Sequence, residues 1–109
     1  MIINKTTKQV ISNQEKFCKN ILSQAIGLMF HKKQNLVMTF PKERKISLHM
    51  FFVSFPIDVL ILDKDYRVIE IKENFKPYSF WKSKKKGKYL VELGFRNDNV
   101  KVDDVLELE

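Results

Sequence analysis

Two kinds of apolar pattern divide the chain, and the first predicts a helix. Near the N-terminus, apolar residues recur at helical spacing with polar residues between them, at Phe17, Ile21, Leu22 and Ala25. Ser12 and Glu15 match a capping box, in which a Ser and a Glu three positions apart satisfy free helix amides. Gly27 is suited to ending the helix, because glycine enters the left-handed region without strain. The pattern predicts one amphipathic helix of about three to four turns between Ser12 and Gly27.

The rest of the chain has the short apolar runs and turn signals that are typical of β-strands. We expect strands over residues 8–12, 36–40, 46–55, 57–62, 66–73, 89–93 and 100–108. Asp63-Lys64-Asp65 separates two of these runs and predicts a β-hairpin. The charged segments 42–45 and 82–88 are expected to be a turn and a loop. The predicted fold class is α+β and β-dominated, with a curled antiparallel sheet or partial barrel of about five to seven strands and one N-terminal amphipathic helix.

Length and composition bound the class of protein. The 109 residues are enough for a single domain, 1–109, and 44% of them are hydrophobic. No apolar run reaches the ~18–20 residues of a membrane span, and no signal-peptide pattern is present, so we expect a cytoplasmic protein without membrane attachment. The single cysteine, Cys18, excludes an internal disulfide and a Cys-only zinc site. Three glycines exclude a glycine-rich phosphate loop, and we predict no cofactor and no metal site.

The charge balance permits contact with an anionic partner but does not require it. The formal net charge is +7, and it is uneven, because residues 89–109 are acidic on a basic body. A basic surface attracts nucleic acid through counterion release. The basic residues are mostly lysine, and base-specific contacts depend more on arginine. The composition therefore indicates weak, non-specific nucleic-acid binding, or a lysine-rich solvated surface with no such partner.

One local motif suggests a partner. Four aromatic residues stand beside a run of lysines, at Phe75, Tyr78, Phe80 and Trp81. Aromatic rings can stack on bases while lysines hold phosphates. The candidate nucleic-acid residues are Trp81, Lys82, Lys84, Lys85, Lys86 and Lys88. The competing interpretation is a basic hairpin tip whose aromatic side chains face the core.

Two acidic residues lie within apolar strands. Asp58 begins the apolar run 57–62, and Glu92 lies inside the run 89–93. A carboxylate in such a place is unfavourable unless it is paired or accepts backbone amides. Asp58 is therefore either an acid in a pocket or a structural acceptor. If the two carboxyl groups converged in one pocket, they could act as a general acid and base.

Several segments, taken in order, resemble the domain of unknown function (DUF) family 192. Residues 25–31, Ala-Ile-Gly-Leu-Met-Phe-His, are similar to its Arg-Gly-Leu-Met-Phe-Arg stretch. Residues 49–58 align in register with its Trp-Met-x-Asn-Thr-x-x-Pro-Leu-Asp block. The hairpin of residues 59–71, the strand of residues 89–93 and Asp104-Val105 also match, so that the resemblance covers about residues 10–108. It implies a small, strand-dominated, barrel-like fold with one helix, and no established reaction.

This sequence departs from the family pattern at several polar positions. The arginine before Gly-Leu-Met is Ile26, the tryptophan is His49, and the glycine before the last aspartate is Asp103. The Asn-Thr pair is replaced by Phe52-Val53. If that pair lines a polar site in the family, this chain has apolar groups in its place.

The leading hypothesis is a non-catalytic module that binds a ligand or protein partner through an apolar surface. The dense aromatic run of residues 49–55 suggests this surface, and the candidate binding residues are His49, Met50, Phe52, Pro56 and Asp58. The alternative is nucleic-acid binding through the basic aromatic segment described above. An enzyme using Asp58 and Glu92 is a third hypothesis, but no catalytic motif supports it and we predict no catalytic residues.

Overall fold

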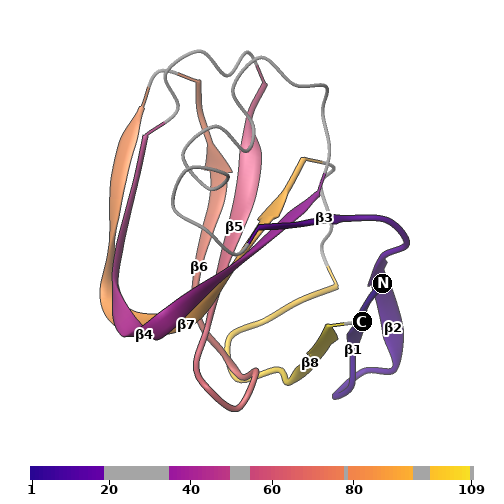
Figure 1. Cartoon of the computed structure of the whole chain (residues 1–109). Coiled ribbons are helices and arrows are strands. Elements are labelled where there is room, and N and C mark those ends of the chain that lie inside the picture. Colours follow the sequence, from indigo (N-terminus) through magenta and orange to yellow (C-terminus); the bar gives the residue numbers. More distant parts are fainter. Residues whose placement is uncertain (19–34, 50–54, 78, 95–98, 109) are drawn as a thin grey trace.

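The described part of the chain is built from strands. The computed structural model describes residues 1–18, 35–49, 55–77, 79–94 and 99–108. The strands are β1 (Ile2–Asn4), β2 (Gln9–Ser12), β3 (Lys16–Cys18), β4 (Leu36–His49), β5 (Ile57–Leu62), β6 (Val68–Phe75), β7 (Phe80–Leu93) and β8 (Leu106–Leu108). They form a three-stranded sheet in the order β2-β1-β8 and a five-stranded sheet in the order β3-β4-β7-β5-β6 (Figure 1).

The two longest strands, β4 and β7, are paired with each other from end to end. Leu36 at the start of β4 faces Glu92, and Leu48 near its end faces Trp81. The register shifts between Thr39 and Arg44, and both strands turn there and run on together on the side of β6 (Figure 1). The turn gives the five-stranded sheet its curl, and among the described strands the sheet does not close into a barrel.

Each face of the five-stranded sheet carries an apolar core. Along β5, Val59 and Ile61 belong to one core, and Leu60 and Leu62 belong to the other. The second core also includes apolar residues of the three-stranded sheet, Ile2, Ile11 and Leu106, which therefore packs on that face. Burial on both faces is typical of a central strand and explains the almost continuous apolar run of residues 57–62.

The predicted N-terminal helix is wrong within the described residues. Lys16–Cys18 form strand β3, which pairs in parallel with Leu36–Met38 of β4. Phe17, expected on the buried stripe of a helix, is 44% exposed. Tertiary pairing with β4 has overridden the local helical preference of this segment. The rest of the expected helix, residues 19–27, lies outside the described residues.

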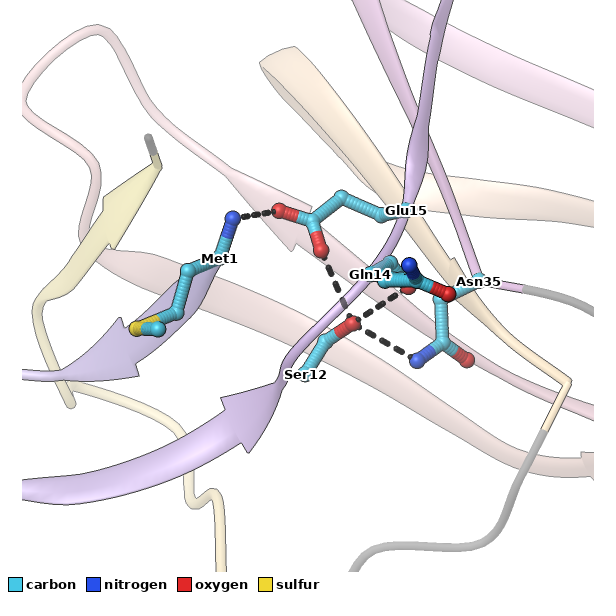
Figure 2. Close-up of polar contacts among 5 residues, drawn as sticks. All are labelled: Met1, Ser12, Gln14, Glu15 and Asn35. Atoms are coloured by element: carbon cyan, nitrogen blue, oxygen red, sulfur yellow. Dashed lines mark hydrogen bonds and ion pairs between the residues drawn. The ribbon is translucent and has the colours of Figure 1, made fainter.

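The side chains that suggested a helix cap instead join the two sheets. Ser12 on β2 donates a hydrogen bond from Oγ to Glu15 Oε2 at 2.9 Å and accepts one from Asn35 Nδ2 at 2.8 Å (Figure 2). Asn35 Oδ1 accepts the backbone N–H of Gly94 at 3.0 Å, directly after β7. The Met1 ammonium forms an ion pair with the buried Glu15 carboxylate (Figure 2). Each polar group here meets a partner, as buried polar groups require.

A second buried polar pair holds the two ends of the chain together. Asn4 on β1 donates from Nδ2 to Asp104 Oδ2 at 2.8 Å, and the same oxygen accepts the backbone N–H of Lys101 at 2.9 Å. Strand β1 lies between β2 and β8, so residues from both ends of the chain share one small sheet. Asp104 thus ties the segment before β8 to β1. Strand β8 itself is shorter than the strand predicted over residues 100–108.

The other strand predictions have mixed outcomes. The hairpin is confirmed: β5 and β6 pair antiparallel, and Asp63 Oδ1 accepts the backbone N–H groups of Asp65 and Arg67 at 2.9 and 3.0 Å. The predicted turn at residues 42–45 and the predicted loop at residues 82–88 are wrong, because both segments are strand. Apart from Lys88, their charged side chains are exposed while the two strands pair with each other, and a run of lysines does not reveal this pairing.

Gly87 is the residue that allows β7 to pass close to β5 at the turn, and this predicts a stability effect. A methyl group at Gly87 would overlap Ile61 Cγ2 and would lie 3.2 Å from the Leu62 carbonyl oxygen. We expect Gly87→Ala to lower the free energy of unfolding by about 1–3 kcal/mol through overpacking. Urea denaturation measures the change. Ser47→Ala, at an exposed position on the neighbouring strand, is the control and should change it by less than about 0.5 kcal/mol. Equal effects of the two substitutions would contradict the role of Gly87.

Candidate nucleic-acid interface

The outer halves of β4 and β7 form a two-stranded ribbon, which we call the basic arm (residues 41–49 and 80–87). Within it, Lys45 faces Lys86, Ser47 faces Lys82, and Phe80 lies across from residue 49. Every Lys and Arg of the arm has an exposed side chain, namely Lys42, Arg44, Lys45, Lys82, Lys84, Lys85 and Lys86. Glu43 is the acidic residue of the arm. The arm therefore concentrates positive charge on one pair of strands.

Alternation along β7 separates an outer side of the arm from an inner side. Phe80, Lys82 and Lys84 are exposed, and Phe80 keeps 68% of its surface in contact with solvent. Trp81 and Ser83 point inward; Ser83 is buried, and the Trp81 ring packs edge-on against Phe75 at 6.4 Å between centroids. Phe80 is thus the aromatic side chain available on the outer side, and Trp81 is mainly a core residue. The period of two in Phe80, Lys82 and Lys84 is the sequence signal that could have shown this.

Lys88, a predicted nucleic-acid contact, is engaged within the protein. Its Nζ donates hydrogen bonds to the carbonyl oxygens of Phe40 at 2.8 Å and Pro41 at 3.1 Å. These carbonyls belong to the irregular part of β4, where the register shift leaves backbone groups without ladder partners. The cation of Lys88 therefore stabilises the turn of the arm, and Lys82, Lys84, Lys85 and Lys86 remain as surface candidates.

The predicted apolar binding surface stays a prediction. Met50 and Phe52 lie outside the described residues, and His49 is described only by its backbone, at the end of β4. Pro56 is exposed. Asp58 is half-buried, and its Oδ1 accepts the backbone N–H of Asn74 at 2.9 Å. This hydrogen bond agrees with the interpretation of Asp58 as a structural acceptor.

Asp58 and Glu92 do not form an acid–base pair. Asp58 lies opposite Leu93, and its neighbour Val59 lies opposite Glu92. Because successive side chains of a strand point to opposite faces, Asp58 and Glu92 lie on opposite faces of the sheet. The geometry required by the enzyme hypothesis is therefore absent for these two residues.

Glu92 is a buried acid in an apolar setting. It is 5% exposed, and it lies between Leu36 of β4 and Val59 of β5, both members of one apolar core. No hydrogen bond or ion pair reaches its carboxyl group from the described residues. Burial disfavours the charged form and raises the pKa of Glu92 from 4.5 to about 7. Glu92 therefore changes charge near neutral pH inside the sheet.

Comparison with known proteins identifies the family. The family model of DUF192, described as "Uncharacterized ACR", matches residues 2–108. The chain belongs to the domain of unknown function family 192. The resemblance inferred from residues 25–31, 49–58 and 59–71 is confirmed, although the helix and the barrel-like shape that it implied are not seen in the described residues.

Relatives of this family-192 chain include UPF0127 proteins of Pyrococcus and Thermococcus species. It is 32% identical over 95 residues to a UPF0127 protein of Pyrococcus horikoshii, a match that covers 84% of this chain and 82% of that protein. It is 35% identical over 96 residues to a UPF0127 protein of Thermococcus kodakarensis, and there the match covers 84% of this chain and 60% of that protein. The family and its relatives carry no assigned activity in these descriptions.

Two solved structures share the fold of this family-192 chain. A protein of Sinorhizobium meliloti 1021, described as a proposed transcription regulator, matches with a TM-score of 0.84 and 21% identity, over 97% of this chain and 88% of that chain. A protein of unknown function from Novosphingobium aromaticivorans matches with a TM-score of 0.75 and 20% identity, over 86% and 74% of the two chains. At this level of identity the likeness shows the fold alone. Within the described residues, no helix has the length and apolar character needed to cross a membrane.

The buried acid predicts how stability depends on pH. The folded protein holds a proton on Glu92 up to about pH 7, whereas the unfolded chain releases it near pH 4.5. Its contribution to stability is therefore complete below that lower value and is lost as the pH rises through about 7. We compare the free energy of unfolding of Glu92→Gln with that of the wild type. From about pH 5 to about pH 8 we expect this difference to shift in favour of the variant by about 2–3 kcal/mol. Urea titrations at the two pH values measure this gain, and a pH-independent difference would contradict it.

Proposed function

We propose that the protein is a non-catalytic binding module that holds single-stranded nucleic acid on the outer side of its basic arm. The observation that carries this proposal is the exposed row of Phe80, Lys82 and Lys84 along β7. A largely exposed phenylalanine offers a face on which a base can stack, and neighbouring lysines supply charge for the phosphates. The row is short and open, which suits a flexible single strand better than a rigid duplex.

The cross-strand charges of the arm support an anionic partner. Lys45 lies directly opposite Lys86, and like charges in this position destabilise a strand pair. A polyanion that binds along the arm relieves this repulsion, because each phosphate compensates nearby cations and releases counterions. The arm therefore gains more from an anionic ligand than an evenly charged surface would.

The choice of lysine over arginine on the arm indicates how the partner is held. Six of the arm's seven exposed cations are lysines and one, Arg44, is an arginine. Lysine binds a phosphate as a point charge, whereas arginine provides the two-pronged geometry that recognises guanine edges. The proposed binding is thus sequence-tolerant. The description of the Sinorhizobium protein as a proposed transcription regulator is compatible with a nucleic-acid partner.

Binding of a ligand or protein at His49, Met50, Phe52, Pro56 and Asp58 is the competing proposal. Pro56 is exposed and supports it. Asp58 supports it less, because its carboxylate already accepts a backbone amide. If nucleic acid is held only by the arm, Pro56→Ala should leave the affinity for nucleic acid unchanged. This variant therefore separates the two surfaces.

Binding to a fluorescent oligouridylate tests the proposed function. We expect Lys82→Gln/Lys84→Gln to weaken binding at low salt and to reduce the slope of log affinity against log salt by about 1.4, since each lost phosphate contact removes about 0.7. Phe80→Ala should lose about 1–3 kcal/mol of binding free energy with the salt slope unchanged, because stacking carries no charge. Fluorescence anisotropy over a salt series measures both effects.

Lys101→Gln is the control for the charge change, and it removes one of the two charges that the arm variant removes. Lys101 is also exposed, but it lies in the acidic C-terminal part of the chain, away from the arm. It should keep wild-type affinity and slope within error. A loss about half as large as that of the two-charge arm variant would point to diffuse attraction by net charge, and no binding at low salt would exclude the proposal.

A further inference from the structure

Two consecutive backbone amides of the basic arm point at one carboxylate of another strand. Glu70 on β6 accepts the Lys84 N–H with both oxygens, at 2.9 Å for Oε1 and 3.1 Å for Oε2. Its Oε1 also accepts the Lys85 N–H at 3.0 Å. We call these two amides the Lys84–Lys85 nest. Strand β6 is not paired with β7, so this contact, together with the packing of Trp81 on Phe75, joins the arm to the far edge of the curled sheet.

A bulge in β7 directs the two amides to the same point. The register with β4 shifts between Lys45 and Ser47, and the extra residues of β7 fall at Ser83–Lys85. Ser83 braces this bulge from inside, since its Oγ accepts the Ile46 N–H at 2.8 Å and donates to the Lys85 carbonyl at 2.9 Å. Ser83 is buried, so the brace is sheltered from water. The nest is therefore held in shape by the arm itself and not by Glu70.

The chemistry of the nest is that of an anion site. Adjacent backbone N–H groups that converge on one point form a concavity that binds anions, phosphate among them. Lys84, Lys85 and the next residue, Lys86, all have exposed side chains, so the nest lies in a cationic stretch of the strand. The carboxylate that fills it comes from β6, which shows that the nest accepts a negatively charged oxygen pair.

We infer that the Lys84–Lys85 nest is a phosphate-binding site, which the Glu70 carboxylate fills in the free protein and which a phosphate group of the ligand takes over on binding. A phosphate offers more negative charge and more acceptor oxygens than a carboxylate, and the adjacent lysines favour it further. Displacing Glu70 also removes the polar contact between the arm and β6, while the packing of Trp81 on Phe75 remains. The inference rests on the proposed function for the source of the phosphate, a nucleic-acid backbone.

Inorganic phosphate is the probe that tests the nest directly. Amide resonances of Lys84 and Lys85 are followed by two-dimensional NMR during titration with phosphate, against sodium chloride of equal ionic strength. In Glu70→Gln, which weakens the internal competitor while keeping its shape, we expect these two amides to shift in a saturable manner with an affinity about tenfold above that of the wild type. Glu43→Gln removes the same charge from the arm without touching the nest and should behave as the wild type.

A further variant separates the nest from general charge. Ser83→Ala keeps every charge but removes the brace of the bulge. The double variant Glu70→Gln/Ser83→Ala should therefore lose most of the phosphate affinity that Glu70→Gln gains. Its other strand resonances, which should be unchanged, show that it is folded. Ser47→Ala in the same background, also a serine of the arm but an exposed one, is the control and should retain it. Equal phosphate affinity in Glu70→Gln and Glu43→Gln, or no shift of the Lys84 and Lys85 amides, would overturn the inference.

Binding of the oligouridylate, measured in parallel, distinguishes this inference from the proposed function. If the oligonucleotide binds and phosphate does not reach the two amides, the inference is wrong and the proposed function stands. If phosphate titrates the amides and the oligonucleotide does not bind, the anion site stands with another phosphate-bearing ligand, and the proposed function is wrong. If both bind, Glu70→Gln should also tighten the oligonucleotide, and more than Glu43→Gln does.

Discussion

The long antiparallel pairing of β4 with β7 is the constraint on which the rest of the structure depends. Its inner half forms the centre of the five-stranded sheet and carries apolar cores on both faces. Its outer half leaves the sheet as the basic arm. A single bend between the halves, with Gly87 packed closely on Ile61, sets the direction of the arm. The same strand pair therefore forms both the centre of the sheet and the arm. The surface that we propose as the interface is placed by the packing of Gly87 on Ile61 at the bend.

Several charged residues act on backbone groups that the strand ladders leave unpaired. Lys88 donates to two carbonyl oxygens at the bend, Asp58 accepts an amide at the end of β6, and Glu70 accepts two amides of the β7 bulge. Irregular backbone in a sheet creates such groups, and a nearby ionised side chain compensates them. The Lys84–Lys85 nest follows the same rule, since the Glu70 carboxylate already occupies a pair of unpaired amides within a lysine-rich strand.

Glu92 differs from these residues because no partner among the described residues meets its carboxyl group. Apolar side chains flank it in the sheet, and its proton is retained to about pH 7. It makes the stability of the sheet sensitive to pH near neutrality. Its position on the opposite face from Asp58 removes the only acid pair that the sequence suggested for catalysis.

The sequence by itself determined the family, through short motifs in order along the chain. It also determined the hairpin around Asp63 and the apolar strand of residues 57–62, because these depend on residues close together in the chain. Tertiary structure alone decided the form of the lysine run, which pairs with β4 about forty residues earlier and is therefore a strand. It also decided the role of Ser12 and Glu15, whose spacing matches a helix cap. Ser12 instead forms hydrogen bonds with Glu15 and with Asn35 and joins the two sheets. Local spacing constrains only neighbouring residues, whereas strand partners, sheet faces and buried polar contacts are chosen by segments far apart in the chain.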